Sequence, residues 1–199
     1  MRQLVVPKPL KVEFASVEIL WHSSAKTRRV DALVLAWVKF EKQLRRLFCF
    51  LVFQHPKINA GQIDSVISVL VKNRDLYPET FIRGIAALGV TPVPTLLADK
   101  HSKLWNEIKR IKKYRDKIMH GQTTGQNVPS AQLERDVLWI IEWVFSLGDA
   151  AQVAFGYNGI ERNTYRMAKS VLTSSVKEYP FSNVAEFKKW LTKLAKQKG

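Results

Sequence analysis

Cysteine is nearly absent from this sequence, since Cys49 is the single thiol among 199 residues. One thiol cannot form an intramolecular disulfide, and it cannot supply the thiolate cluster of a structural zinc site. His22, His55 and His101 also stand apart, without the spacing of metal ligands. We therefore expect neither a metal nor a cofactor, and we expect the protein to work in a reducing cytoplasm.

Long hydrophobic segments are lacking as well. The longest apolar runs, such as Leu47 to Phe53, are about a third of the roughly 20 residues that a membrane span needs. Near the start of the chain, Pro7 and Pro9 interrupt the stretch in which a signal peptide would place its continuous apolar segment. These absences predict a protein that does not cross a membrane.

Acidic residues are scarce relative to basic ones. The chain has 17 Asp and Glu against 32 Lys and Arg, which gives a formal net charge of +15. An excess of this size favours a polyanionic partner, because contacts with phosphates release condensed counterions. Nucleic acid, and RNA in particular, is the partner that we expect. The alternative is that the charge serves solubility alone.

Apolar residues recur at intervals of three and four along most of the chain, a period that predicts amphipathic helices. The predicted helices span residues 30–54, 59–73, 78–89, 98–120, 130–155, 161–175 and 183–196. The fold class is therefore all-α, a helical bundle.

The segments outside this core are interpreted from their prolines. Residues 1–29 are read as an N-terminal extension of short extended pieces, because Pro7 and Pro9 break any long element. Residues 90–94 contain two prolines and predict a rigid connector. The helical core would then span residues 30–156, and residues 157–199 would form a C-terminal helical appendage packed on it.

One arginine falls on the apolar side of the predicted helix 98–120. A helical projection places Arg115 within the stripe formed by Leu104, Ile108, Ile111 and Ile118. On helix 30–54, Glu41 likewise lies in an apolar stripe, and burial of a lone carboxylate is costly. We predict that Glu41 approaches Arg115. The pair would either tether two helices or belong to a substrate-binding site, and the sequence leaves both interpretations open.

An adjacent band of the same helix carries groups suited to chemistry on RNA. Lys109, Lys113, Asp116 and His120 follow one another at three or four residues, so they share one side of the helix. The two lysines are candidate ligands for substrate phosphates. His120 is the candidate catalytic base or acid, together with Arg115 and Asp116.

The chemistry follows from the residue types. RNA supplies its own nucleophile, the 2′-hydroxyl, so an enzyme has to remove that proton, protonate the leaving 5′-oxygen and stabilise the charged phosphorane. A histidine that titrates near neutrality serves as base or acid, and an arginine binds the nonbridging oxygens that gain charge. Asp116 lies four residues before His120, where it would orient the imidazole.

The string Arg115-Asp116-Lys117-Ile118-Met119-His120 resembles the Arg-polar-x-x-x-His motif of the HEPN (higher eukaryotes and prokaryotes nucleotide-binding) superfamily. The resemblance covers the motif closely and the helical core of residues 30–155 loosely. It implies a HEPN-like bundle and a metal-independent endoribonuclease of a bacterial toxin or phage-defence type. Arg115 and His120 would be catalytic, with Asp116 at the polar position.

The resemblance also implies partners. Such enzymes commonly form homodimers in which two motifs share a composite active site, and toxins of this type are held by an antitoxin. In one toxin subgroup, a partner nucleotidyltransferase modifies a tyrosine two residues beyond the histidine. Gln122 occupies that position here, so this route of regulation is not implied.

Two other interpretations remain alongside the nuclease. One is a non-catalytic RNA-binding or regulatory module on the same scaffold, and the other is a helical interaction protein with an acidic partner. The predicted helix 183–196 begins with Asn183 and Glu186 in capping-box spacing and has an apolar side and a lysine-rich side. Packing with its lysines in water is the first interpretation of that helix, and contact with RNA or a membrane surface is the second.

Overall fold

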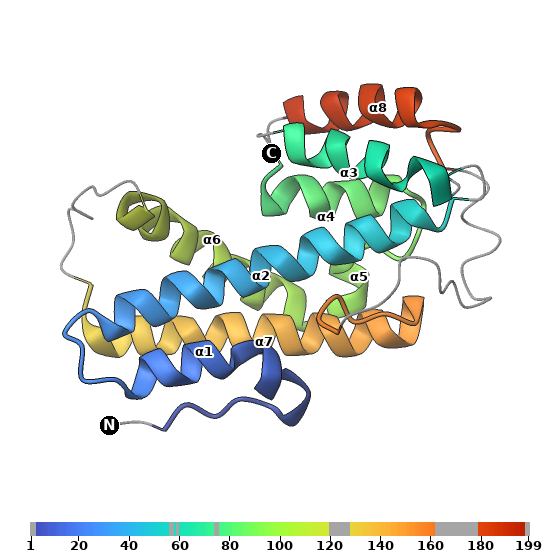
Figure 1. Cartoon of the computed structure of the whole chain (residues 1–199). Helices are drawn as coiled ribbons and strands as arrows, with labels where there is room; N and C mark the ends of the chain where they lie inside the picture. The colour runs from blue at the N-terminus through green and yellow to red at the C-terminus, as the bar shows by residue number, and fades with distance from the viewer. Residues whose placement is uncertain are drawn as a thin grey trace. The chain divides into compact units, whose positions relative to one another are not determined.

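A computed structural model describes residues 3–55, 58, 60–73, 76–119, 128–161 and 179–197. All regular structure in these ranges is helical, which confirms the predicted all-α class (Figure 1). The elements are η1 (Lys8–Leu10), α1 (Lys11–His22), α2 (Arg28–Phe53), η2 (Ala60–Gln62), α3 (Ile63–Lys72), α4 (Pro78–Ala87), α5 (Val93–Leu97), α6 (Lys100–Met119), α7 (Ser130–Phe155) and α8 (Val184–Lys196).

The contacts divide the chain into two compact units. Unit 1 consists of residues 1–42 and 97–147, and unit 2 of residues 43–96 and 148–199. Each unit is discontinuous in sequence, because α2 and α7 both contribute residues to the two units. The three consecutive segments expected from the sequence, 1–29, 30–156 and 157–199, remain a prediction.

The helix α1 corrects one expectation, since the sequence indicated extended pieces within residues 1–29. Pro7 and Pro9 precede α1 and belong to the turn of η1, where a proline loses no helical hydrogen bond. They therefore start helical structure instead of breaking it. Phe14, Val17 and Trp21 then follow at intervals of three and four residues and are at most 1% exposed.

The expected connector at residues 90–94 is also partly wrong, because α5 begins at Val93. Pro94 occupies the first turn of this short helix, where its missing N–H is not needed. Ala98 separates α5 from α6 with a φ of 48°, a left-handed conformation that a helix cannot continue through. The predicted helix 161–175 lies outside the described residues beyond position 161.

A buried arginine joins three helices of unit 1. Arg29 on α2 is 6% exposed, and its Nη1 donates to the carbonyl oxygen of Trp21 on α1 at 2.8 Å. Its Nη2 lies 2.8 Å from Oε1 of Glu134 on α7, and its guanidinium stacks 4.2 Å from the Trp21 ring centroid. The partners compensate the loss of hydration of the charge.

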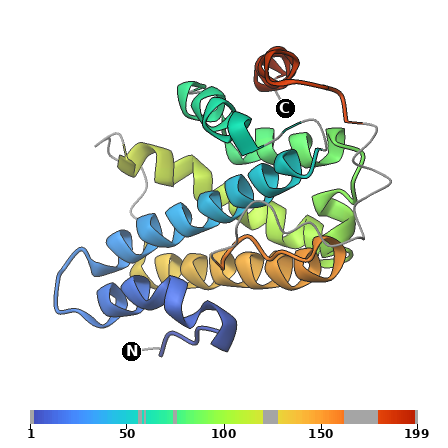
Figure 2. The same ribbon diagram turned by 45° about the vertical axis from the view of Figure 1, so that its right-hand side comes forward.

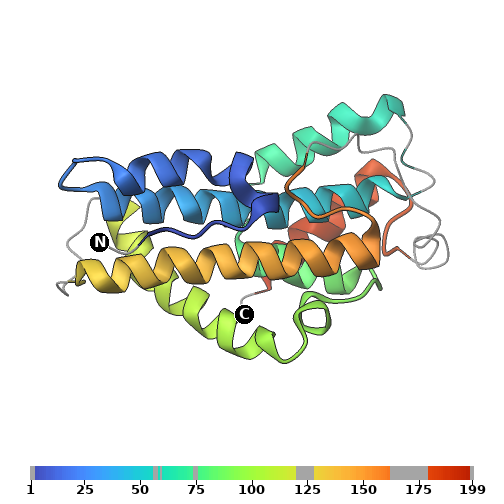
Figure 3. The same cartoon turned by 90° about the horizontal axis from the view of Figure 1, so that it is seen from below.

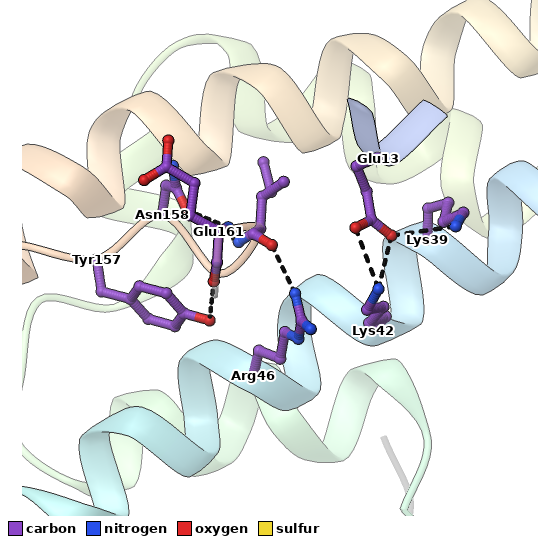
Figure 4. A network of polar contacts seen from close by, with 8 residues as sticks. Glu13, Lys39, Lys42, Arg46, Tyr157, Asn158 and Glu161 are labelled. Atoms are coloured by element: carbon purple, nitrogen blue, oxygen red, sulfur yellow. Dashed lines mark hydrogen bonds and ion pairs between the residues drawn. The ribbon is translucent and has the colours of Figure 1, made fainter. Parts of the chain in front are cut away.

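A second ion-pair group connects α1 with α2 in unit 1 (Figure 4). The Glu13 carboxylate accepts hydrogen bonds from Nζ of Lys42 at 2.8 and 3.1 Å, and Nζ of Lys39 lies 3.2 Å from it. Burial opposes the charge of Glu13, but the two ammonium groups outweigh burial and lower its pKa from the usual 4.5. The carboxylate therefore stabilises the fold above pH 4.5 and loses this contribution as the pH falls.

Glu13→Gln is expected to lower the free energy of unfolding by about 1 kcal/mol near neutral pH, and by much less at an acidic pH low enough to protonate the wild-type carboxyl in the folded protein. Urea denaturation of both proteins at the two pH values measures the difference. A gap that stays constant with pH would contradict the assigned ion pair.

Unit 2 is built around aromatic contacts. The helices α3, α4 and α8 lie side by side (Figures 1 and 2). The Phe48 ring lies 5.6 Å from Phe81 and 6.1 Å from Trp190, measured between centroids. A Cβ on Gly84 would approach Phe48 Cε2 to 2.6 Å, so the close packing of α4 requires a glycine there.

A turn after α7 completes unit 2 (Figure 4). The Oδ1 atom of Asn158 accepts from the backbone N–H of Ile160 at 2.9 Å, and Arg46 Nη1 donates to the carbonyl oxygen of Ile160. Gly159 has a φ of 75°, and a Cβ there would lie 2.8 Å from Leu47 Cγ. Glycine is therefore required both by the backbone conformation and by the available space.

The helix α7 is long and apolar enough to cross a membrane by length and composition alone. Its best window has a mean hydropathy of 1.3, although no single apolar run in the sequence approaches a span. One such helix is weak evidence, because the core helix of a soluble protein passes the same test. Here 44% of the window is buried within the protein, and Val137, Ile140 and Leu147 are fully buried.

Candidate functional site

The candidate site lies on α6, whose apolar side was predicted correctly in its main part. Leu104, Ile108 and Ile111 are at most 2% exposed, whereas Ile118 is only half-buried. Tyr114 takes the next buried position of the stripe with an exposure of 9%. The helix contains neither proline nor glycine from Lys100 to Met119, so nothing in its sequence interrupts the hydrogen bonding.

Arg115 and Glu41 are in contact, which confirms that prediction. Nη2 of Arg115 donates to Oε1 of Glu41 on α2, and Nη1 donates to Oδ1 of the neighbouring Asp116 at 2.7 Å. The Arg115 side chain is 18% exposed, and those of Glu41 and Asp116 are 35% and 43% exposed. The guanidinium is therefore largely buried, and its two carboxylate partners are accessible to water.

Trp37 completes this arrangement and was not predicted as a site residue. Its Nε1 donates to Oε1 of Glu41 at 2.7 Å, so one carboxylate oxygen accepts from both Trp37 and Arg115. The Arg115 guanidinium carbon lies 4.5 Å from the Trp37 ring centroid, a cation–π distance. We call Trp37, Glu41, Arg115 and Asp116 the Arg115 cluster.

The cluster fixes Arg115 from three sides. Glu41 and Asp116 each bind a different terminal nitrogen, and the indole covers one face of the guanidinium. Arg115 Nε is buried and has no acceptor among the described residues. A guanidinium has five N–H groups in a rigid fork, so the terminal N–H groups of Arg115 that the two carboxylates do not bind have a fixed direction.

The other predicted site residues differ in how the structure places them. Lys109 and Lys113 are exposed on α6, about two turns and one turn, respectively, before Asp116 of the cluster. Asp116, which was expected to orient His120, binds Arg115. His120 itself, together with residues 121–127, lies outside the described residues, so its predicted contacts are not part of the structure.

The field around the cluster is positive although the cluster itself has two carboxylates. Residues 100–119 of α6 contain eight Lys and Arg against Glu107 and Asp116, a net charge of +6. A phosphate that approaches this helix is therefore attracted over a distance of about the Debye length, 8–10 Å at ordinary salt.

A second polar network on α6 was missed by the sequence analysis. Asp136 on α7 is fully buried and accepts hydrogen bonds from Tyr114 Oη, Arg110 Nη2 and, at 2.7 Å, Gln132 Nε2. Burial raises the pKa of Asp136, and the charge of Arg110 opposes that rise. Tyr114 adjoins Arg115, so this network fixes the rotation of α6 at the position where the cluster begins.

A groove elsewhere in unit 1 is lined by none of the predicted site residues. It has a volume of about 740 Å³ and lies among α6, α7 and residues 3–7, which run along α7 (Figure 3). Trp139 forms part of its wall, and Nζ of Lys103 lies 4.9 Å from the Trp139 ring centroid. Trp143, in contrast, is fully buried and packs 5.6 Å from Phe40, as expected for a core residue.

The other histidines occupy unlike surroundings. His22 is exposed, and His55 is 4% exposed against the rings of Tyr179 and Phe181. His101 stacks on Trp105, and burial together with the charge of Lys109 lowers its pKa. These three side chains are therefore placed by packing or by solvent.

Comparison with known proteins gives no relative, because no family model, no curated protein and no solved structure matches the chain. The chemistry of the site is therefore inferred from the geometry of the Arg115 cluster and from the motif in the sequence.

Proposed function

We propose that the protein is a metal-independent endoribonuclease with a HEPN-like site, in which Arg115 and His120 act on an RNA phosphodiester. The observation that carries the proposal is the Arg115 cluster. A guanidinium is held rigidly by two carboxylates and an indole, five residues before the only histidine of the motif. Preorganised cations of this kind stabilise developing charge without reorganisation.

In the proposed reaction, one imidazole removes the proton of the 2′-hydroxyl. The 2′-oxygen then bonds to phosphorus, and the bond between phosphorus and the 5′-oxygen breaks. A protonated imidazole gives its proton to that 5′-oxygen. The products are a 2′,3′-cyclic phosphate and a free 5′-hydroxyl, and Arg115 compensates the charge on the nonbridging oxygens.

Two imidazoles are needed if base and acid act in one step, and each copy of the chain contributes one His120. We therefore propose a homodimer with a composite site. The dimer would act in the cytoplasm as part of a toxin or phage-defence system, and an antitoxin would restrain its activity. Lys109 and Lys113, exposed on the same helix, would bind phosphates on either side of the scissile bond.

The test is an RNA-cleavage assay with analysis of the product ends. Wild-type protein is expected to cut a labelled single-stranded RNA in the presence of EDTA and to leave 2′,3′-cyclic phosphates. His120→Ala, purified in parallel, is expected to be inactive, and so is the wild type on a 2′-O-methyl strand of the same sequence. Cleavage that persists in His120→Ala, or products with 3′-hydroxyl ends, would remove the proposal.

A second candidate function is supported by the same cluster. Both terminal nitrogens of Arg115 are bound by carboxylates, which also suits a residue that ties α6 to α2 in a non-catalytic RNA-binding module. In that case RNA would bind with steep salt dependence and remain intact in the assay above.

A further inference from the structure

The exposed side of α8 is a row of basic residues. Lys188, Lys189, Lys193 and Lys196 are all exposed and recur at intervals of one, three and four residues along one side of the helix. With Ala185 and Thr192 they line a groove of about 610 Å³. We call these four residues the α8 lysines.

The α8 lysines have no anionic partner among the residues that the structure describes. No carboxylate occurs between Lys188 and Lys196, and no ion pair joins these ammonium groups to any described residue. Glu186, the acid at the start of the helix, accepts hydrogen bonds from the backbone and hydroxyl of Ser182 at 2.7 Å. Like charges three or four residues apart destabilise a helix, so the α8 lysines lower the stability of α8. Solubility does not require that lysines be placed so close together.

The opposite side of α8 is committed to the interior of unit 2. Phe187 and Leu191 are fully buried, Leu194 is 6% exposed, and the helix contacts α3 and α4. Arg83 on α4 donates to the carbonyl oxygen of Gln197 at 2.6 Å, which holds the C-terminal end of α8 in place.

Burial of the apolar side distinguishes between two possible partners of a basic amphipathic helix, a membrane surface and a nucleic acid. A helix that lies in a membrane surface inserts its apolar side between the lipids. In α8 that side is already occupied, and the groove on the exposed side offers Ala185 and Thr192 besides the lysines. A phosphate strand needs only the exposed cations, so charge complementarity favours nucleic acid over a membrane.

We propose that the α8 lysines form a second contact surface for the phosphate backbone of single-stranded nucleic acid, one that reads no base sequence. If the protein is a nuclease, this surface would favour substrates that extend beyond the segment at the scissile bond. That part of the inference rests on the proposed function. The binding itself does not require cleavage.

The experiment measures binding of the full-length protein to a fluorescent 2′-O-methyl oligonucleotide of about 30 residues, which lacks the nucleophile and stays intact. Anisotropy titrations over a range of salt give the slope of log K against log salt, about −0.7 per phosphate contact for a single strand. Replacement of all four α8 lysines by Gln is expected to reduce the slope by about 2 to 3 and to weaken binding about tenfold or more at low salt.

Two control variants separate a local surface from overall charge. Arg at all four α8 positions keeps the charge and should keep the slope. Gln at four scattered exposed lysines removes the same charge and should change the slope by about one or less. The scattered positions are Lys8, Lys11, Lys26 and Lys72. Circular dichroism verifies that every variant is folded.

The proposal is overturned if the α8 variant binds the strand with the wild-type slope, or if the scattered variant loses as much. It is also overturned if the α8 variant loses binding only to phosphatidylserine vesicles. Because the probe cannot be cut, loss of slope in an inactive protein would support the α8 surface while the nuclease proposal fails.

Discussion

Arg115→Lys is expected to lower kcat/KM for RNA cleavage about 100-fold or more, although the positive charge is kept. A lysine ammonium cannot donate to Glu41 and Asp116 in the planar geometry of the guanidinium, and it has no second edge to present to a phosphate. The loss is expected mainly in kcat, because the binding of the rest of the strand does not depend on this residue. Single-turnover cleavage with labelled RNA measures the effect.

A matched control is available on α7. Arg135 is exposed and donates to Oε1 of Gln132 at 2.7 Å, away from the Arg115 cluster, so Arg135→Lys should cleave at the wild-type rate. Thermal unfolding of Arg115→Lys distinguishes catalysis from a tether. An unfolding temperature that falls while the folded variant still cleaves within about twofold of the wild type would assign Arg115 to packing alone.

Asp136→Ala is expected to cost about 3 kcal/mol of stability. The substitution leaves Tyr114 Oη and Gln132 Nε2 without their acceptor at a fully buried position, and Arg110 Nη2 keeps only its bond to Glu107 Oε2. Removal of one partner from a buried charged network costs about 3–5 kcal/mol, and the lower value applies because the Arg110 side chain is 38% exposed. Urea denaturation followed by circular dichroism gives the difference.

Glu142→Ala provides the comparison on the same helix. The Glu142 carboxylate is 44% exposed and pairs with Nζ of Lys100 at 3.1 Å, so its removal should change stability by about 0.5 kcal/mol or less. If the two variants were equally stable, the Asp136 network would not hold α6 against α7. Asp136→Ala should also cleave RNA more slowly than its folded fraction predicts, because the network that it breaks includes Tyr114, the neighbour of Arg115.

The period of the apolar residues was sufficient to predict the long helices. The helix predicted at residues 30–54 is α2, Arg28–Phe53, and the helix predicted at residues 130–155 is α7 with the same bounds. Asn183 caps α8 as predicted, because its side chain accepts from the N–H of Glu186 at 3.0 Å. Such features are local, and each depends on residues within about two turns of one another.

The prediction of extended structure in place of α1 was wrong because the effect of a proline depends on its position relative to the helix. A proline breaks a helix in the interior but is tolerated in the first turn, and the sequence alone did not show on which side of Pro9 the helix lies. The apolar spacing of Phe14, Val17 and Trp21 was the signal that would have decided it.

Part of the site could be predicted because a charge in an apolar stripe demands a partner. This reasoning paired Glu41 with Arg115 across 74 residues, and that contact is confirmed. The same reasoning applied to Asp136, between Leu133 and Val137, would have found the second network. Trp37 was assigned to the core, since nothing in the sequence indicates that an indole stacks on one particular guanidinium.

The interleaving of the two units along the chain has a consequence for biosynthesis. Unit 1 combines residues 1–42 with 97–147, so α1 and the first half of α2 leave the ribosome well before α6 and α7 can cover them. Contacts between such distant segments require closure of long loops, which slows folding. The aromatic side chains of the nascent N-terminal helices therefore stay exposed until most of the polypeptide has been translated, and neither unit corresponds to a contiguous fragment that an expression vector could encode.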